Sequence, residues 1–308
     1  MVNYSAIWSQ LSNAGGNATA MATAGNFTQW ILATGIGGGV PQQATMKSFS
    51  DSLPNLVRYA MNIDLTGQGA LFPQPVVVVT DAGPALTLSY RQRKGMVDVV
   101  LVPQYSSDLT NWTNVPAANI IQLPDDDVNT ARYIAAMLQS PNQLLYLRVV
   151  ALPNNSPVTQ WPVSAGGNGH YYQAIVGLGI VDLRYAQNYA AALGGYVVTI
   201  TSAEENAFVF NLVNAPQFWA NDTADSYGPL LGANGVSVLQ WVNNEGPLNS
   251  TYTNWASGLT FFPGNSYEGV QFFGTGLNNL QPTWNAFRQG GFLQSSFVVE
   301  FDSKPAGN

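Results

Sequence analysis

The chain has 308 residues, no cysteine, and a formal net charge of −7 at pH 7 from 17 acidic and 10 basic residues. Its length indicates two or three domains, and the scarcity of clustered Lys and Arg excludes nucleic acid as a partner. The absence of cysteine excludes disulfides, thiolate metal sites and a cysteine nucleophile.

Apolar residues make up 46% of the chain and charged residues only 9%, so there is ample material for a core. Amide and hydroxyl side chains must then cover the surface, as is common in secreted, virion and self-assembling proteins. The single histidine, His170, leaves most hydrolytic and transition-metal chemistry without a base or ligand set. We interpret it as structural.

No apolar run is long enough to span a membrane. The first residues lack the basic start and apolar middle of a signal peptide, so we expect either a removed signal or another export route. The expected location is extracellular, on a cell surface or in a virus particle.

Residues 1–74 are predicted to form a small helical N-terminal region that serves assembly. Helices are expected over 27–35 and 48–65, where apolar residues recur at helical spacing. The glycine-rich stretch 35–41 between them lacks the Lys-Ser/Thr of a phosphate loop, so we interpret it as a joint.

Residues 75–153 are predicted to form an antiparallel β-sandwich-like domain. Short β-rich runs such as "VVVVT", "ALTLSYRQR" and "LLYLRVV" are separated by Gly, Pro and Asp/Asn signals. Leu86, Leu88 and Tyr90 alternate with polar residues, which indicates one buried and one solvated face. A single helix is expected within the domain, over 127–140.

The segments "PNLVRYAMNIDL", "SSDLTNW" and "LLYLRVVAL" resemble a module found near the C-terminal ends of secreted verrucomicrobial and planctomycete proteins. The resemblance covers about residues 27–152 and implies a spacer or surface-attachment unit without catalysis. Relatives often carry an Asp-rich calcium loop before the "NL..YA" helix. Here Asp51 is the only acid in that place, so no calcium site is carried over.

A linker over 154–168, rich in Asn, Pro and Gly, precedes an α+β domain predicted for 169–303. Asp182 is a candidate N-cap for a helix that Gly194 ends. After a strand, Ser202 and Glu205 form a predicted capping box, in which Glu205 reaches back to the Ser202 amide.

The order of "YYQAI", "AQNYAAALGGYVVTITSAEENAFV", "LQWVNNEGPLNSTYTNWASG", "EGVQFF", "PTWNAF" and "SFVVEF" resembles the C-type-lectin-like domain over about residues 169–301. The resemblance implies two helices beside a small antiparallel sheet, with a long irregular loop region from about 243 to 283. The whole chain is therefore expected to be an α+β multi-domain protein.

Departures from that family bear on its usual disulfides and calcium. Ala190 and Val299 stand where one disulfide would be, and Gly269 stands in one half of the other. The family's Glu-Pro-Asn loop and "WND" segment supply oxygen ligands to calcium. Ala286 removes the final Asp here, and so few carboxylates remain that we expect no metal and no other cofactor.

We expect a non-catalytic recognition or adhesion protein that binds a glycan or surface protein through its long-loop face. Aromatic rings suit stacking, and amides with a carboxylate suit hydrogen bonding. The candidate ligand-binding residues are Phe261, Phe262, Asn265, Tyr267, Glu268 and Asn285.

The composition of the chain also bears on two other functions. A structural subunit of a filament, surface layer or virus particle, in which the chain contacts copies of itself, fits the low charge and amide-rich surface. An enzyme is disfavoured, because the acid pairs at Asp125–Asp127 and Glu204–Glu205 lie in a predicted loop and a predicted cap.

Overall fold

The computed structural model describes residues 26–34, 41–48, 53–63, 75–80, 83–127, 129–138, 144–222, 224–235, 238–248, 252–259, 269–287 and 294–305. The chain divides into two compact units, one of residues 18–30 and 42–152, the other of residues 1–17, 31–41 and 153–308. We call them the sandwich unit and the C-terminal unit. The domain boundaries given above stay predictions.

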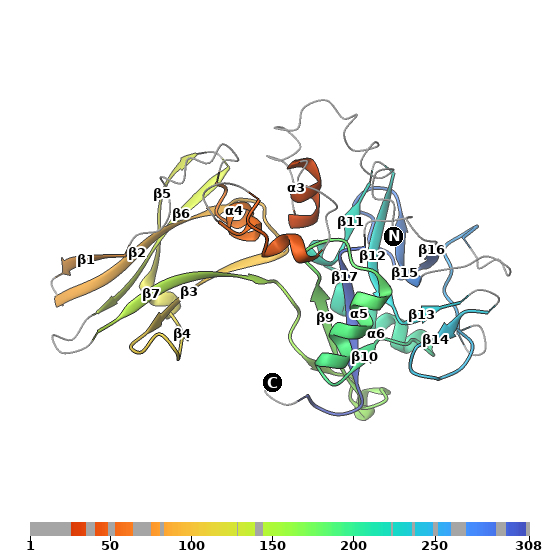
Figure 1. Cartoon of the computed structure of the whole chain (residues 1–308). Helices are drawn as coiled ribbons and strands as arrows, with labels where there is room; N and C mark the ends of the chain where they lie inside the picture. The colour runs from red at the N-terminus through yellow and green to blue at the C-terminus, as the bar shows by residue number, and fades with distance from the viewer. Residues whose placement is uncertain are drawn as a thin grey trace. The chain divides into compact units, whose positions relative to one another are not determined.

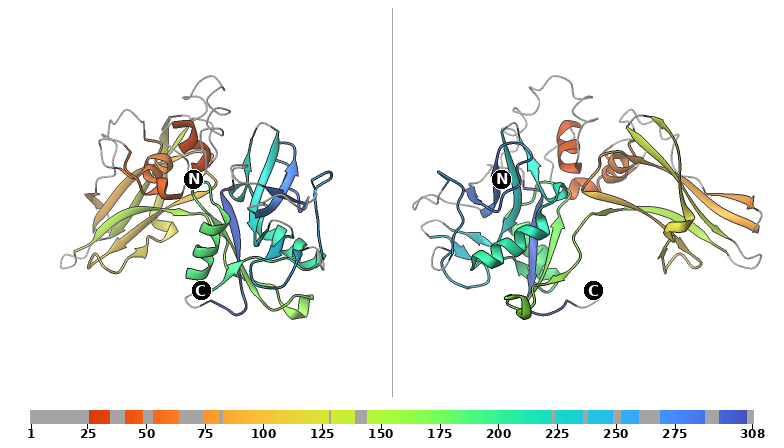
Figure 2. Two further views of the ribbon diagram at one scale, coloured as in Figure 1. Left: turned by 45° about the vertical axis from the view of Figure 1, so that its right-hand side comes forward. Right: turned by 180° about the vertical axis from the view of Figure 1, so that it is seen from behind.

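The sandwich unit is built from two β-sheets (Figures 1 and 2). One sheet has the strand order β1-β2-β6-β5 and the other the order β4-β3-β7. The strands are β1 (Pro75–Thr80), β2 (Gly83–Arg93), β3 (Val99–Ser106), β4 (Thr113–Asn114), β5 (Ile120–Asp127), β6 (Thr130–Leu138) and β7 (Tyr146–Pro153), with a 3-10 turn at Ala117–Asn119.

The core of the sandwich unit forms where the inner faces of the two sheets meet. Leu86, Leu88 and Tyr90 of β2 are buried there with Leu147 of β7, as their alternation predicts. The opposite face of β2 is less solvated than expected, because Thr87 is also buried and its hydroxyl donates to the Val76 carbonyl.

The helix expected over 127–140 is wrong: residues 130–138 form strand β6, and Asp127 ends β5. It pairs antiparallel with β2 from Thr130 to Leu138, and Tyr133, Ala135 and Met137 pack into the core at the spacing of a strand. The alanines favour a helix locally, but pairing on both sides with β2 and β5 overrides that preference.

Helix α3 (Phe27–Thr34) confirms the first expected helix, whereas α4 (Asn55–Ala60) is shorter than the expected 48–65. Pro54 immediately precedes α4, and Asn62 stands beyond its end at φ +52°. A short 3-10 helix, Pro41–Ala44, lies between the two.

Asp98 fixes the start of α3 to the sandwich unit. Its buried carboxylate accepts from the Phe27 amide at 2.6 Å and from the Tyr59 hydroxyl at 2.8 Å. Burial is the main reason that the pKa of Asp98 rises to about 6.

The C-terminal unit contains a sheet of strand order β16-β15-β12-β17-β9-β8, to which β10 and β11 add (Figure 1). Its strands are β8 (Thr159–Gln160), β9 (Tyr171–Val176), β10 (Tyr196–Val197), β11 (Ala220–Asn221), β12 (Asp225–Leu231), β15 (Gly269–Thr275), β16 (Trp284–Phe287) and β17 (Ser296–Phe301). A separate ladder joins β13 (Ala233–Asn234) to β14 (Gln240–Trp241). The first long strand of this sheet, β9, pairs antiparallel with its last strand, β17, in the middle of the sheet.

Two helices accompany this sheet, α5 (Leu183–Ala192) and α6 (Ala203–Val213), with 3-10 turns at Val163–Ala165 and Pro216–Phe218. Asp182 caps α5 as predicted by accepting from the Tyr185 amide at 2.6 Å. Gly194 follows α5 at φ +82°, a conformation that favours glycine.

The predicted capping box at α6 is half right. Ser202 accepts from the Glu205 amide at 3.1 Å. Glu205, however, accepts from the amide of Thr201 at 2.8 Å rather than from that of Ser202.

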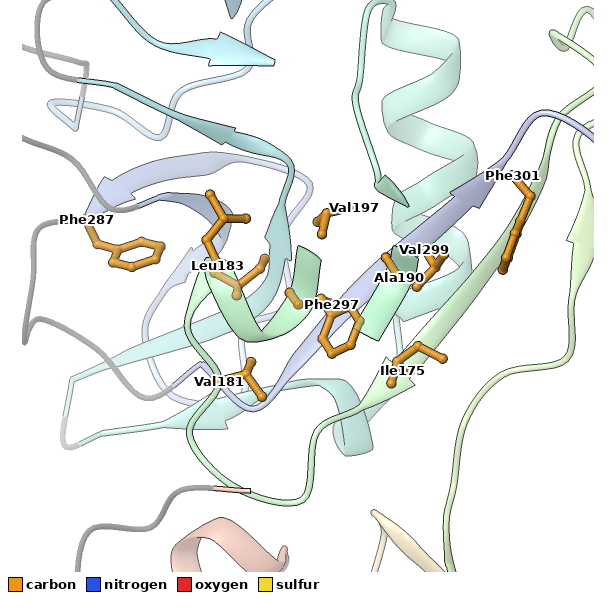
Figure 3. Close-up of a cluster of buried hydrophobic side chains, with 11 residues drawn as sticks. Ile175, Val181, Leu183, Ala190, Val197, Phe287, Phe297, Val299 and Phe301 are labelled. Atoms are coloured by element: carbon orange, nitrogen blue, oxygen red, sulfur yellow. The ribbon is translucent and has the colours of Figure 1, made fainter. Parts of the chain in front are cut away.

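The core of the C-terminal unit packs α5 against β9 and β17 (Figure 3). Ala190 and Val299 are both fully buried in this cluster, with Phe297 and Val197 beside them. An apolar contact therefore occupies the region where the resembled family carries a disulfide.

Candidate functional site

We call residues 232–268, between β12 and β15, the excursion. Its described parts, 232–235, 238–248 and 252–259, lie outside the main sheet. It includes the small β13–β14 ladder, which closes through register pairs Ala233–Trp241 and Asn234–Gln240. The irregular loop expected from 243 to 283 thus ends earlier, because β15 begins at Gly269.

Trp284 at the start of β16 anchors the excursion. Its side chain is fully buried, and three rings meet it edge-on, those of Trp241, Tyr252 and Trp255, at centroid distances of 6.2, 5.5 and 5.9 Å. Edge-to-face packing of this kind is favourable beyond the area that it buries. The rings of the excursion therefore share a core with the sheet.

Amide side chains tie the same region together. Asn206 of α6 accepts from the Trp284 indole N–H at 2.8 Å. Asn206 and Asn254 both donate to the Pro282 carbonyl, at 3.1 and 2.7 Å. These bonds hold α6, the excursion and the segment before β16 in one fixed arrangement.

All but one of the predicted ligand-binding residues lie in 260–268, outside the described residues. They are Phe261, Phe262, Asn265, Tyr267 and Glu268. The contacts of Trp284 fix the described residues that lead up to this segment, and Gly269 of β15 follows it directly.

Asn285, the remaining predicted residue, is buried in β16 and is engaged within the protein. Its side-chain oxygen accepts from Gln271 at 2.8 Å, and Gln271 in turn accepts from Gln294 at 2.9 Å. A chain of buried neutral amides therefore uses the Asn285 oxygen that the resemblance would offer to calcium.

Among the described residues, no group of three or more His, Cys, Asp or Glu side chains is placed to hold a metal ion. The expectation that the protein needs no cofactor stays a prediction, because Glu268 is outside the described residues.

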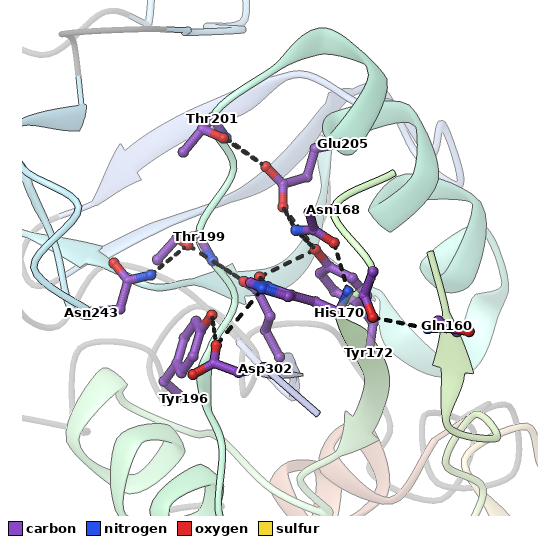
Figure 4. A network of polar contacts seen from close by, with 12 residues as sticks. Gln160, Asn168, His170, Tyr172, Tyr196, Thr199, Thr201, Glu205, Asn243 and Asp302 are labelled. Atoms are coloured by element: carbon purple, nitrogen blue, oxygen red, sulfur yellow. Dashed lines mark hydrogen bonds and ion pairs between the residues drawn. The ribbon is translucent and has the colours of Figure 1, made fainter. Parts of the chain in front are cut away.

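Sequence analysis missed a buried polar network on the face of β17 beside α6 (Figure 4). Two carboxylates, Glu205 and Glu300, are almost fully buried. The Tyr172 hydroxyl lies between them, donating to Glu205 at 2.8 Å and lying 3.2 Å from Glu300. Asn168 donates to the Tyr172 oxygen at 2.7 Å.

Each carboxylate has further partners. Glu300 lies 2.7 Å from Nδ1 of His170 and accepts from the Thr199 amide at 3.2 Å. Glu205 accepts from the Thr201 amide and hydroxyl at 2.8 and 3.0 Å. The network thus joins residues 168–172, the turn before α6, and the last strand, β17.

Burial is the main reason that the pKa of Glu300 rises to about 7, and the nearby charge of Glu205 acts in the same direction. Burial likewise raises the pKa of Glu205. The pKa of Tyr172 is raised far above its usual range by burial and by both carboxylates. The tyrosine therefore stays a neutral hydrogen-bond donor, which suits a structural role.

A signal for this network was present in the sequence. Glu300 is the only charge in the apolar run "SFVVEF", and a carboxylate in a strand buried on both faces needs partners. Its partners could not be identified, because His170 and Tyr172 lie about 130 residues earlier in the chain.

No described helix is long and apolar enough to cross a membrane. Neither a family model nor a curated protein sequence matches the chain.

Several solved structures resemble part of the chain. One is the carbohydrate-recognition domain of cow CD23, solved with an oligosaccharide. The match has 20% sequence identity and a TM-score of 0.32, and it covers 44% of this chain and 89% of the CD23 chain. The carbohydrate-recognition domain of a mouse scavenger receptor C-type lectin shares 16% identity over 43% of this chain and 92% of its own, with a TM-score of 0.30. A Ca²⁺-dependent type II antifreeze protein in its Ca²⁺-free form shares 15% identity over 44% and 93%, with a TM-score of 0.33.

Proposed function

We propose that the chain is a non-catalytic extracellular recognition protein that binds a glycan through residues 260–268 of its C-terminal unit. A surface protein is the alternative ligand. The observation that carries the proposal is the excursion, which leaves the sheet after β12 and is fixed by Trp284, Asn206 and Asn254. A fixed base allows a loop to present aromatic and amide groups at low entropic cost.

The segment beyond that base has the composition of a recognition surface. It reads "TFFPGNSYE" and supplies Phe261, Phe262 and Tyr267 for stacking, with Asn265 and Glu268 for hydrogen bonds. The described carboxylates of the C-terminal unit that are buried, Glu205 and Glu300, already have protein partners. We therefore assign both carboxylates a structural role and propose no catalytic role for them.

The test is a glycan array and a panel of cell-surface proteins probed with the whole chain. A variant with Phe261, Phe262 and Tyr267 changed to Ser should lose binding about a hundredfold, because three lost stacking contacts at ~1 kcal/mol each remove ~3 kcal/mol.

The control variant is Leu277→Ser, on the exposed turn between β15 and β16, which should bind like the unmodified chain. Binding that survives the triple change, in a variant with an unchanged circular dichroism spectrum, would contradict the proposal.

A further inference from the structure

Strand β1 of the sandwich unit carries an unusual run of exposed apolar side chains. Val76, Val77, Val78 and Val79 are 55, 54, 43 and 84% exposed. Among the described strands, β1 is the outermost of its sheet and pairs only with β2 (Figure 1). In an antiparallel ladder every second residue directs its N–H and C=O away from its partner strand, so β1 also offers backbone groups to a further strand.

The valine side chains of β1 lie alternately on the two faces of the sheet, next to mostly apolar residues of β2. On the inner face, Val77 is the register partner of the buried core residue Leu86. On the outer face, Val78 pairs with Ala85, and Ala85 with Leu138, which is itself 56% exposed. Another strand beside β1 would therefore cover apolar side chains on both faces.

The opposite edge of the same sheet is protected. β5 contains Pro124, which has no N–H to donate, and Asp125, whose carboxylate pairs with Lys94 at 2.6 Å. β1 has a proline only at its first position and contains no charged residue. The part of β2 from Gly83 to Ser89 also contains no charged residue.

We propose that β1 pairs antiparallel with β1 of a second copy of this chain, forming a two-fold dimer. Each copy carries a net charge of −7, which opposes self-association, so the least repulsion between two copies arises where both surfaces are uncharged. Pairing β1 with itself brings two uncharged edges together and closes after two copies. If β1 of one copy paired with β5 of another, Pro124 and Asp125 would lie in the interface. Each pair would also leave one β1 and one β5 free, so copies could add without end.

The interface is a six-residue strand pair, which is small beside the ~1,200 Å² or more that stable interfaces bury. The dimer should therefore be in concentration-dependent equilibrium with the monomer. This inference does not depend on the proposed ligand site, which belongs to the C-terminal unit, so either can fail without the other.

Cysteine cross-linking tests the pairing directly, because the chain has no cysteine of its own. A two-fold axis perpendicular to the sheet places one residue of β1 directly opposite its own copy, and the two central residues of β1 are Val77 and Val78. Whichever of the two lies on the axis should give a disulfide-linked dimer under mild oxidation when it is changed to cysteine, as Val77→Cys or Val78→Cys. The controls are Ile121→Cys, at an exposed site on β5, and Leu109→Cys, in an exposed loop. Both should stay monomeric under the same conditions.

A second variant measures the equilibrium in solution. Val77→Lys places like charges in the paired edge and should shift sedimentation toward the monomer, while Leu109→Lys, with the same added charge, should not. Equal cross-linking at Ile121, or no cross-linking at Val77 and Val78 in folded variants, would overturn the proposal. So would a chain that is monomeric at every concentration.

Discussion

Glu300 shows how one residue can hold several distant segments together. Its carboxylate lies within hydrogen-bonding distance of His170, Tyr172 and Thr199, which come from separate parts of the C-terminal unit. Burying a carboxylate is unfavourable unless it is paired or protonated. Burial is therefore the main reason that the pKa of Glu300 is raised to about 7, and the nearby charge of Glu205 adds to the shift.

This raised pKa predicts a pH dependence of stability. The folded state holds the proton more tightly than the unfolded state, whose Glu pKa is about 4.5. The stabilisation that protonated Glu300 gives to the folded state is therefore complete below about pH 4.5, and it is lost as the pH rises through about 7. Between pH 4 and pH 8, the free energy of unfolding of the unmodified chain should fall by about 3 kcal/mol more than that of Glu300→Gln.

Denaturant unfolding of the two proteins across this pH range measures the difference. Taking the difference removes the contribution of Asp98, whose raised pKa acts in the same direction in the other unit. Glu204→Gln, the same change at an exposed side chain of α6 outside this network, is the matched control and should leave the slope unchanged. A pH-independent difference between the unmodified chain and Glu300→Gln would contradict the account.

Single residues also show which contacts could be predicted from the sequence. The caps at Asp182 and Ser202 were predictable because each bonds within three residues of itself. Glu205 was interpreted only as part of a cap. Its bond to Tyr172 spans 33 residues and depends on how the sheet folds, which no local pattern encodes.

At the scale of elements, α6 and the excursion depend on one another through Asn206. This side chain accepts from the Trp284 indole and donates to the Pro282 carbonyl. Asn206→Ala should leave the buried indole N–H without its partner and destabilise the chain by about 1–3 kcal/mol.

Thermal unfolding of Asn206→Ala tests this, with Asn211→Ala on the exposed side of the same helix as the control. The control should change stability by less than about 0.5 kcal/mol. Equal effects of the two changes would show that Asn206 does not anchor the excursion.

Strand β6 shows the limit of prediction at this scale. Its sequence, "TARYIAAML", satisfies helical and strand periodicity equally well. Only its position between β2 and β5 decides the outcome, and that position depends on contacts about 45 residues apart, such as Leu88–Ala135.

At the scale of the whole molecule, function is expected to be independent of calcium. Asn285 is committed to Gln271, and Ala286 replaces an oxygen ligand of the resembled family. Ligand binding and the unfolding midpoint should both be the same in millimolar calcium and in excess chelator. A chelator that abolishes binding or lowers the midpoint would contradict this expectation.

The element order of the C-terminal unit could be predicted because glycine stops, caps and tryptophan positions are local signals. The order includes the strand at Tyr171, the two helices and the last strand. The sandwich was likewise predictable as a class from its β-rich runs. The buried network and the exposed edge of β1 could not be predicted, since each depends on which surfaces folding leaves covered.

The central claim is that ligand meets the chain at residues 260–268. Amide hydrogen exchange with and without the best ligand from the array tests it most directly. The account predicts slower exchange in residues 252–268, with no change in the sandwich unit beyond the error of the measurement. Protection confined to residues 75–153, with none in 252–268, would contradict it.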